Sequence, residues 1–236
     1  MSIMIAEIFG PTIQGEGPLI GLPSIFVRTA GCNDRCLWCD SPHAVLPDYR
    51  GEWRRMTAGE VLAAVGRCAR NRPALVTLTG GNPALHDLRQ LIADGAAAGH
   101  RFALETQGNV AKPWFAALDW LVLSPKPPSA GLDFDAAALA ACVSAAGSTT
   151  VVALKFPILD DGDYRFARGV ADALPHLPAY LQPVNPYPAE GGDAARLPDL
   201  LDRLRWLMER LAADDWPAAR VLPQLHLLAW GSRRGV

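Results

Sequence analysis

The sequence predicts an α/β protein built as a partial, open (β/α)6-type barrel with parallel strands. After residue 50, short β-branched runs bounded by glycine or proline alternate with longer Ala/Leu-rich amphipathic runs, the pattern of repeated strand–helix units. Such units form parallel sheets through right-handed crossovers. The six strand candidates are too few for a closed eight-stranded barrel, which favours an open one.

The predicted elements follow one another regularly along the chain. The strand candidates are Ser24–Ala30, Leu75–Thr79, Arg101–Glu105, Trp120–Leu123, Thr149–Phe156 and Ala179–Pro183. The helix candidates are Thr57–Arg70, His86–Ala98, Asp135–Ala145, Asp163–Leu174 and Leu197–Ala213. Thr57 and Glu60 fit a capping box at the first helix, and Gly99 and Gly147 stand where helices should end. The turn-rich run Pro183–Gly192 is predicted to be a loop that leaves the last strand.

Residues 1–236 are predicted to form a single domain. The length suits one large domain, and a chain that is 50% hydrophobic and 19% charged can bury a sizeable core. The formal charge of −2 leaves no global basic field, so we expect no nucleic-acid partner and no membrane partner. No apolar run approaches the length of a membrane span and the start lacks a signal-peptide pattern, so we expect a cytoplasmic protein.

Three cysteines crowd into one short loop directly after the first strand candidate. Cys32, Cys36 and Cys39 have the spacing C-x3-C-x2-C, and thiolates at such short spacings suit iron–sulfur clusters and zinc. Three cysteines would leave one iron of a 4Fe-4S cluster without a protein ligand, open to a small chelating molecule. A closed zinc site is the alternative, with Asp40 or His43 as the fourth ligand. Cys68 and Cys142 lie in helix candidates, where cysteine behaves as a small hydrophobic residue.

The cysteine loop resembles the signature of the radical S-adenosylmethionine superfamily, with Trp38 in its aromatic position. That resemblance implies a 4Fe-4S cluster held by Cys32, Cys36 and Cys39, with S-adenosylmethionine on the open iron. Leu78-Thr79-Gly80-Gly81-Asn82-Pro83 stands where the superfamily usually has Gly-Gly-Glu-Pro, so Asn82 replaces an acid. On its own, a glycine pair at this place indicates only a strand-to-helix turn.

The N-terminal segment narrows the resemblance to the 7-carboxy-7-deazaguanine synthase family. The matching residues include Gln14-Gly15-Glu16-Gly17, Arg28 before Gly31-Cys32, Cys39-Asp40-Ser41, Glu105-Thr106, Ser124-Pro125-Lys126, Gln182-Pro183 and His226. The family resemblance implies ring contraction of 6-carboxy-5,6,7,8-tetrahydropterin to 7-carboxy-7-deazaguanine, with release of ammonia. This reaction belongs to 7-deazapurine (queuosine-type) biosynthesis.

The resemblance also implies roles for individual residues. Substrate contacts are expected from Ile13, Gln14, Gly15, Glu16, Arg28, Thr79 and His226. S-adenosylmethionine contacts are expected from Gly81, Asn82, Ser124, Pro125, Lys126 and Gln182. Ser41 is expected to bind Mg²⁺ beside the substrate, although a serine before Pro42 also suits a plain turn. Chemically, Gln14 and Glu16 suit the N–H donors of a pterin, and Arg28 offers a fork of donors to a carboxylate. A lone histidine in an apolar run, such as His226, otherwise suits a packed core.

Two alternatives to this function remain from the residues alone. A different radical enzyme, such as a glycyl-radical activase, would share the cysteine loop but has no need for Gln14, Glu16 and Arg28. A zinc-stabilised binding protein without catalysis is the other. The family further implies a homodimer and an external reductant such as flavodoxin. Asn82, Gln107 where serine is frequent, and the tail WGSRRGV depart from the family pattern.

Overall fold

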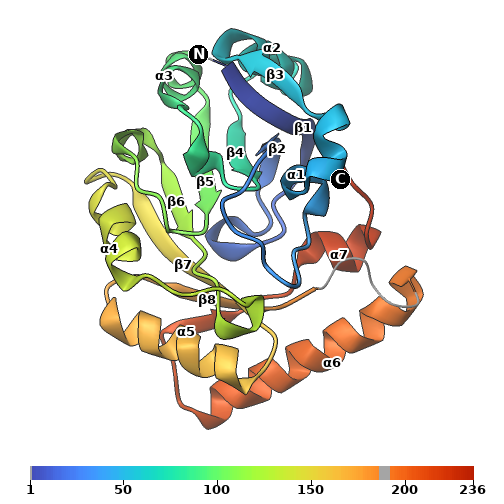
Figure 1. The fold of residues 1–236 in the computed structure, drawn as a ribbon, viewed down its shortest axis with the longest axis vertical. Helices are drawn as coiled ribbons and strands as arrows, with labels where there is room; N and C mark the ends of the chain where they lie inside the picture. The colour runs from blue at the N-terminus through green and yellow to red at the C-terminus, as the bar shows by residue number, and fades with distance from the viewer. Residues whose placement is uncertain (1, 186–191) are drawn as a thin grey trace.

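The computed structural model describes the backbone of residues 2–185 and 192–236, and the side chains of residues 2–185 and 197–236. Within that part, one sheet holds nine strands in the spatial order β3-β1-β2-β4-β5-β6-β7-β8-β9 (Figure 1). All neighbours from β2 to β9 are parallel, whereas β1 pairs antiparallel with both β2 and β3. The strands are β1 Ser2–Ile13, β2 Pro23–Thr29, β3 Arg54–Thr57, β4 Leu75–Gly80, β5 Arg101–Thr106, β6 Trp120–Leu123, β7 Val151–Ile158, β8 Ala179–Pro183 and β9 Ala219–Val221.

Helices connect the parallel strands and lie outside the curved sheet, while the long loop after β2 runs through the space that the sheet surrounds (Figure 1). The α-helices are α1 Pro42–Val45, α2 Ala58–Cys68, α3 Arg89–Ala97, α4 Ala136–Ser144, α5 Asp161–Ala173, α6 Gly192–Ala213 and α7 Leu225–Trp230. The 3-10 helices are η1 Gly17–Leu19, η2 Pro47–Glu52, η3 Pro83–Leu85, η4 Pro113–Ala117 and η5 Pro128–Ala130. In the described part of the chain, no helix combines the length and the apolar character that crossing a membrane requires.

The predicted fold class is confirmed, because the sheet is mostly parallel and open. All six predicted strands and all five predicted long helices are present, with ends that differ by a few residues. β1, β3, β9 and α7 were not predicted. Gly10-Pro11 interrupts the apolar pattern of β1, and β3 and β9 are too short to show a period. The capping box of Thr57 and Glu60 is present at the start of α2. Of the predicted loop Pro183–Gly192, residues 186–191 lie outside the described residues.

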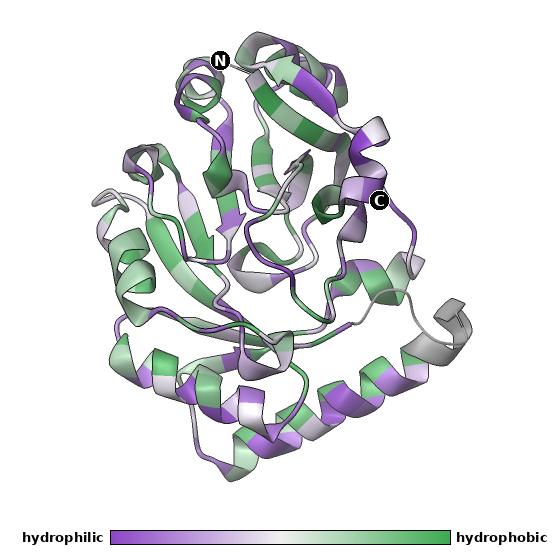
Figure 2. Ribbon diagram, in the orientation of Figure 1, coloured by the Kyte–Doolittle hydropathy of each residue, from purple (hydrophilic) through white to green (hydrophobic). Residues whose placement is uncertain are grey.

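Alternation along the strands separates a hydrophobic core from a polar interior. Successive side chains of a strand point to opposite faces of the sheet. One phase buries leucine and phenylalanine under the helices, as with Leu104 on β5 and Leu154 and Phe156 on β7. The other phase carries Glu105 and Lys155, which therefore face the opposite side, toward the space that the sheet surrounds. Figure 2 shows the hydrophobic residues concentrated along the strands and on parts of α5 and α6.

Two consecutive glycines let β4 end close to the backbone that follows β2. Gly80 has φ +140°, and a Cβ atom there would lie 2.1 Å from the carbonyl oxygen of Thr29. A Cβ atom on Gly81 would lie 2.1 Å from the carbonyl oxygen of Gly31. The pair is therefore required for a close contact between backbone segments, because any side chain would push the start of the cysteine loop away.

Candidate active site

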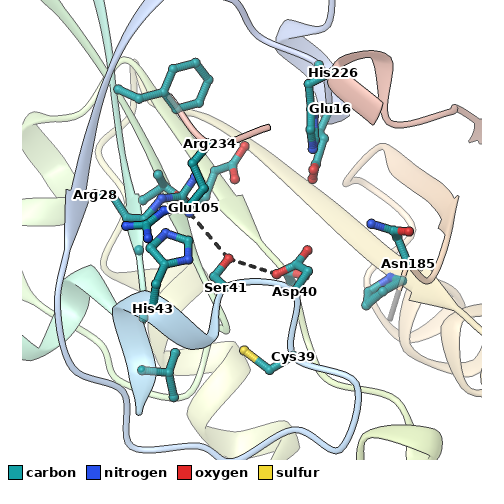
Figure 3. Close-up of a pocket in the computed structure, with 18 of the residues that line it drawn as sticks. Glu16, Arg28, Cys39, Asp40, Ser41, His43, Glu105, Asn185, His226 and Arg234 are labelled. Atoms are coloured by element: carbon teal, nitrogen blue, oxygen red, sulfur yellow. Dashed lines mark hydrogen bonds between the residues drawn. The ribbon is translucent and has the colours of Figure 1, made fainter. Parts of the chain in front are cut away.

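A cavity of about 250 Å³ lies at the carboxyl ends of the parallel strands. Ligand sites of parallel α/β folds collect at this edge of the sheet. Fifteen of the predicted site residues line the cavity: Ile13, Gln14, Gly15, Glu16, Arg28, Cys32, Cys36, Cys39, Ser41, Thr79, Gly81, Ser124, Lys126, Gln182 and His226. Figure 3 shows several of them, from segments far apart in the sequence, around one space. The fold thus brings most of the predicted residues together.

The cysteine loop, residues 32–39, is held in place by contacts from several elements. The indole N–H of Trp38 donates to Ser129 Oγ over 2.9 Å, and Ser129 Oγ donates to Asp163 Oδ2 over 2.6 Å. The backbone N–H of Leu37 donates to the carbonyl oxygen of Ala130. Contacts within the protein therefore anchor the cysteine loop to η5 and α5.

Burial raises the pKa of all three loop thiols. For Cys39, burial and the neighbouring Asp40 raise the pKa to about 11. For Cys32 and Cys36, burial raises the pKa, while the charge of Lys126 acts in the opposite direction. A metal centre binds the thiolate form, so binding here requires loss of these protons, and Lys126 favours that loss.

The two candidate fourth ligands for zinc make contacts elsewhere. His43 Nε2 lies 3.3 Å from Glu7 Oε1, and Asp40 Oδ1 accepts a hydrogen bond from Ser41 Oγ. Among the residues that the structure describes, no three His, Cys, Asp or Glu side chains are grouped closely enough to hold a single metal ion. This arrangement does not support a closed zinc site, whereas a cubane cluster spreads its ligands over several iron atoms.

Buried charged and glutamine side chains form a hydrogen-bonded group, which we call the strand wall. Glu105, Lys155 and Gln182 lie on β5, β7 and β8, and the segments after β1 and before α7 add Gln14, Glu16 and Gln224. Lys155 Nζ lies 2.6 Å from Glu16 Oε2 and 3.2 Å from Glu105 Oε2. Burial alone would lower the pKa of Lys155, but the two carboxylates raise it above its usual range. Burial would raise the pKa of Glu16, but the charge of Lys155 lowers it below its usual range. Glu16 and Lys155 are therefore both ionised at neutral pH.

Glutamine side chains complete the strand wall. Gln182 and Gln224 donate to the two oxygens of Glu16 over 3.0 and 2.8 Å, and Gln14 Nε2 donates to Glu105 Oε1 over 2.9 Å. With Lys155, Glu16 thus accepts three hydrogen bonds of the roughly four that a carboxylate can accept. The sequence predicted that the Glu16 carboxylate contacts the N–H donors of a pterin, and in the structure the chain itself already occupies most of its acceptor positions.

Glu105 and Lys155 were not predicted as site residues. The family resemblance includes Glu105 without implying a role for it, and it does not include Lys155. The signal was present in the sequence, because each is a charged residue inside an otherwise apolar strand and in the phase opposite to the buried leucines. Their pairing with Glu16 could not be found locally, since 139 residues separate Glu16 from Lys155.

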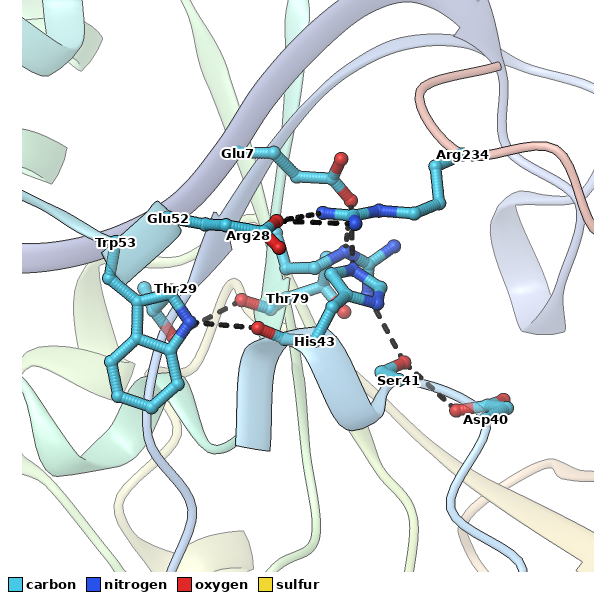
Figure 4. A network of polar contacts seen from close by, with 10 residues as sticks. All are labelled: Glu7, Arg28, Thr29, Asp40, Ser41, His43, Glu52, Trp53, Thr79 and Arg234. Atoms are coloured by element: carbon cyan, nitrogen blue, oxygen red, sulfur yellow. Dashed lines mark hydrogen bonds and ion pairs between the residues drawn. The ribbon is translucent and has the colours of Figure 1, made fainter. Parts of the chain in front are cut away.

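Arg28 belongs to a second group of polar contacts, at the β1–β2 end of the cavity (Figure 4). Glu7 and Arg28 are direct partners across the two strands, and Arg28 Nε donates to Glu7 Oε1 over 2.8 Å. Burial would raise the pKa of Glu7, but hydrogen bonds from His43 and Arg28 and the charge of Arg28 lower it to about 2. The predicted carboxylate-binding arginine therefore already has an acid of the chain as its partner.

Ser41 lies between Arg28 and Asp40. Its hydroxyl donates to Asp40 Oδ1 over 2.9 Å and lies 3.5 Å from Arg28 Nη1. Oxygen ligands of this kind fit a hard cation such as Mg²⁺. One hydroxyl and one neighbouring carboxylate form a sparse site, so most of the ligands would have to come from a bound molecule and water.

Gly15 and His226 come together although they lie at opposite ends of the chain. A Cβ atom on Gly15 would lie 2.8 Å from His226 Nδ1, and the backbone N–H of Leu225 donates to the carbonyl oxygen of Gly15. The glycine therefore allows α7 to pack against the N-terminal loop, and this contact places His226 at the cavity. The apolar sequence around His226 would by itself suggest a core position, but this contact between distant segments brings His226 to the cavity.

Two predicted residues lie away from this cavity. Asn82 is 0% exposed and takes part in four side-chain hydrogen bonds, with Asn33, Asn109, Ala84 and Thr106. These bonds use the full capacity of its amide, so the geometry differs from the predicted cofactor contact and makes Asn82 an anchor of the cysteine loop. Pro125 lines a smaller adjoining pocket, which Lys126 also borders.

Comparison with known proteins agrees with the fold and the loop. The family model described as "Radical SAM superfamily" matches residues 26–120, which include the end of β2, the cysteine loop and the Gly80-Gly81 turn. The structure of Streptococcus suis SuiB bound to S-adenosylmethionine has a similar fold, with a TM-score of 0.52 at 11% identity over 81% of this chain and 44% of that one. Fold and cysteine loop together define a radical S-adenosylmethionine protein.

Closer relatives give the particular family. The 7-carboxy-7-deazaguanine synthase of Bacillus subtilis is 40% identical over 99% of this chain and 98% of its own length, and that of Bacillus cereus is 36% identical over 99% of both. The crystal structure of QueE from Escherichia coli superposes with a TM-score of 0.69 at 26% identity, over 95% of this chain and 94% of that one. The chain belongs to the 7-carboxy-7-deazaguanine synthase family.

Membership of the radical S-adenosylmethionine superfamily implies a 4Fe-4S cluster and S-adenosylmethionine, and the residues present fit both. Three thiols from one anchored loop line the cavity, and Lys126 stands beside them as a counter-charge. The side-chain carbonyl oxygens of Gln107 and Gln182, which both line the cavity, are buried and have no hydrogen-bond partner in the described part of the chain. Acceptors of this kind suit the amino and hydroxyl donors of a nucleoside-bearing cofactor.

Proposed function

We propose that this protein converts 6-carboxy-5,6,7,8-tetrahydropterin to 7-carboxy-7-deazaguanine, with release of ammonia, in 7-deazapurine biosynthesis. The observation that carries the proposal is one cavity shared by the cysteine loop, the Gln14–Gly17 loop and Arg28. A glycyl-radical activase needs the loop but has no use for the other two. Residues 1–236 would act as one radical S-adenosylmethionine domain.

The cluster and S-adenosylmethionine, when bound, supply the one-electron chemistry that removes a hydrogen atom from the substrate. Cys32, Cys36 and Cys39 would hold the cluster, and Gly81, Ser124, Lys126 and Gln182 would line the cofactor side of the cavity. The protein's own contribution is to orient the substrate and to exclude water.

The strand wall would bind the pterin ring. Glu105 accepts two hydrogen bonds from the chain, so its carboxylate retains acceptor positions for the N–H groups of an aminopyrimidinone. Gln14 is fixed by Glu105 and by the backbone N–H of Glu16, which leaves one amide hydrogen for a ring oxygen or nitrogen. Lys155 is a positioning residue in this proposal, because it holds both carboxylates without contacting the substrate.

The β1–β2 end of the cavity would bind the polar edge of the substrate that carries the carboxylate. Arg28 would donate to this group, and Ser41 would contribute to a Mg²⁺ ion whose other ligands come from the substrate and water. Mg²⁺ binding is therefore expected to depend on the substrate. His226, Ile13, Gly15 and Thr79 would complete the substrate contacts.

The family resemblance also supports three proposals about the protein's surroundings. The cluster needs an external electron donor, for which a flavodoxin is our proposal. We propose a homodimer and a cytoplasmic location, where a reducing environment protects the thiols.

The test is anaerobic incubation of the reconstituted protein with S-adenosylmethionine, dithionite and 6-carboxytetrahydropterin. We expect 7-carboxy-7-deazaguanine to form and the protein to bind about four irons per chain, as a single cubane cluster requires. A protein that holds such a cluster is brown. Cys36→Ala should abolish both the product and this colour, whereas Cys68→Ala, at a cysteine outside the cavity, should retain them. Cleavage of S-adenosylmethionine without any deazapurine would refute the substrate assignment and leave the superfamily intact.

A further inference from the structure

The last six residues of the chain form a further part of the cavity. Residues 231–236, which we call the C-terminal strap, follow α7 and line the cavity. Arg234 extends from the strap toward Arg28 (Figures 3 and 4), and its Nη1 and Nη2 donate to Glu52 Oε2 over 3.3 and 3.2 Å. Gly235 lies against Phe9, since a Cβ atom there would lie 4.0 Å from the Cβ atom of Phe9. The strap therefore crosses from α7 to β1 and η2 at the Arg28 end of the cavity.

The Arg28 guanidinium already has two partners within the chain. Its Nε donates to Glu7 at 2.8 Å, and its Nη1 is directed to Ser41 at 3.5 Å. Glu7 also neutralises the charge of Arg28, and the lowered pKa of Glu7, about 2, keeps that carboxylate ionised at neutral pH. An incoming anion at this end therefore meets an arginine that is already paired. A cationic side chain beside Arg28, in addition to the Mg²⁺ ion proposed at Ser41, would strengthen the binding of that anion.

Arg234 is a cation of the strap that can be released for this purpose. Its partner Glu52 is 52% exposed and its own side chain is 43% exposed, so water competes with their ion pair at both ends. Glu52 is also close to the second polar group, because the next residue, Trp53, donates its indole N–H to the carbonyl oxygen of His43. If a substrate carboxylate replaced Glu52 as the partner of Arg234, the guanidinium could stay at the cavity that Arg234 already lines.

We propose that Arg234 is a specificity-determining residue, which leaves Glu52 and binds the substrate carboxylate together with Arg28. Glu52 holds the guanidinium in place before the substrate arrives and becomes fully hydrated afterwards. The inference rests on the proposed function, since it takes the substrate to carry a carboxylate. It assigns the discrimination between carboxylated and uncharged pterins to a residue in the C-terminal tail.

The test compares two stable probes, 6-carboxypterin and 6-hydroxymethylpterin, by calorimetric titration of the reconstituted protein with S-adenosylmethionine and no reductant. Arg234→Ala should weaken 6-carboxypterin binding about tenfold, the value of one charge-assisted hydrogen bond at a partly exposed site. It should leave 6-hydroxymethylpterin binding unchanged. Arg234→Lys should lie between, because lysine keeps the charge but loses the fork. Glu52→Gln should tighten 6-carboxypterin binding, because it removes the competing carboxylate.

A matched control is Arg205→Ala, which removes an exposed ion pair of the same type with Asp202 on α6 and should change neither affinity. Equal loss of affinity for both probes in Arg234→Ala, or no loss for either, would overturn the inference. Weaker 6-carboxypterin binding in Glu52→Gln would also overturn it, because the resting ion pair would then be the element that matters. These titrations need no turnover, so a wild-type protein that fails to form 7-carboxy-7-deazaguanine refutes the proposed function separately.

Discussion

The charged side chains of the strand wall form ion pairs with one another. The thiols of the cysteine loop, in contrast, have pKa values that burial raises, so burial favours their protonated form. Lys155 Nζ lies 2.6 Å from Glu16 and 3.2 Å from Glu105, and the pKa values of Glu16 and Lys155 move in the directions that keep both ionised. In the loop, burial raises the pKa of Cys39 to about 11. One side of the cavity is therefore completed by folding, while the other is completed only when a metal centre takes the thiolates.

This difference has a consequence for how the cavity assembles. The strand wall depends on contacts between distant segments, so it forms only with the whole sheet. The cysteine loop depends on spacing within eight residues and on local anchors such as Trp38. Substitutions in the strand wall should therefore change mainly the free energy of unfolding. Substitutions in the cysteine loop should change mainly the properties of the metal centre.

The largest expected effect is that of Lys155→Met. Removal of the lysine leaves two buried carboxylates without a counter-charge, and breaking a buried ion pair in this way costs about 3–5 kcal/mol. The free energy of unfolding in urea should fall by this amount, and substrate binding should be lost. Lys155→Met/Glu105→Gln should recover a large part of the stability, because one carboxylate is then neutral. Lys112→Met serves as the control, and a Lys155→Met protein as stable as wild type would contradict the comparison.

A second effect concerns Glu7, which lies at the β1–β2 end of the cavity and is also paired by the chain. A pKa lowered from 4.5 to about 2 corresponds to about 3 kcal/mol of stability at neutral pH. Because the pKa is lower in the folded state, this contribution is present above pH 4.5 and disappears as the pH falls toward 2.

Glu7→Gln should therefore lower the free energy of unfolding most at neutral pH, and its difference from wild type should narrow between pH 4.5 and about 2. The measurement is urea denaturation of the iron-free chain across that range. Glu209→Gln, at an exposed glutamate on α6, should show no such pH dependence. A difference that stays constant with pH would show that Glu7 acts through its shape and not its charge.

The smallest expected effect tests the loop. Gln107 Nε2 donates to Cys32 Sγ over 3.1 Å and to the carbonyl oxygen of Gly81 over 3.0 Å. Hydrogen bonds to cluster sulfurs raise the reduction potential, and the loss of one, at about 1 kcal/mol, corresponds to a fall on the order of 40 mV. Gln107→Ser should produce this fall in an EPR-monitored redox titration with little change in stability. The surface variant Gln90→Ser should not, and an unchanged potential in Gln107→Ser would show that the contact is absent once the cluster is bound.

Much of the fold could be predicted because its signals are local. The alternation of apolar strands with amphipathic helices follows from side-chain direction within each element, so all six predicted strands are found in the sheet. β1 was not predicted because Gly10-Pro11 interrupts its alternation of apolar and polar residues. In the structure it forms hydrogen bonds with two strands, β2 and β3. Its strand character comes from its neighbours and not from its own residues.

For the candidate site, the sequence alone determined the residue types: three closely spaced thiols, a Gln-Gly-Glu-Gly loop and an arginine before the first cysteine. Only the tertiary structure decided how they are used. It pairs Glu16 with Lys155 across 139 residues, buries Asn82 in the anchors of the cysteine loop, and returns the C-terminal strap to the Arg28 end of the cavity. The spacing of residues within one loop determines which side chains can bind the same metal centre. The partner of a buried charge is set by contacts between distant segments, and these cannot be read from a local sequence pattern.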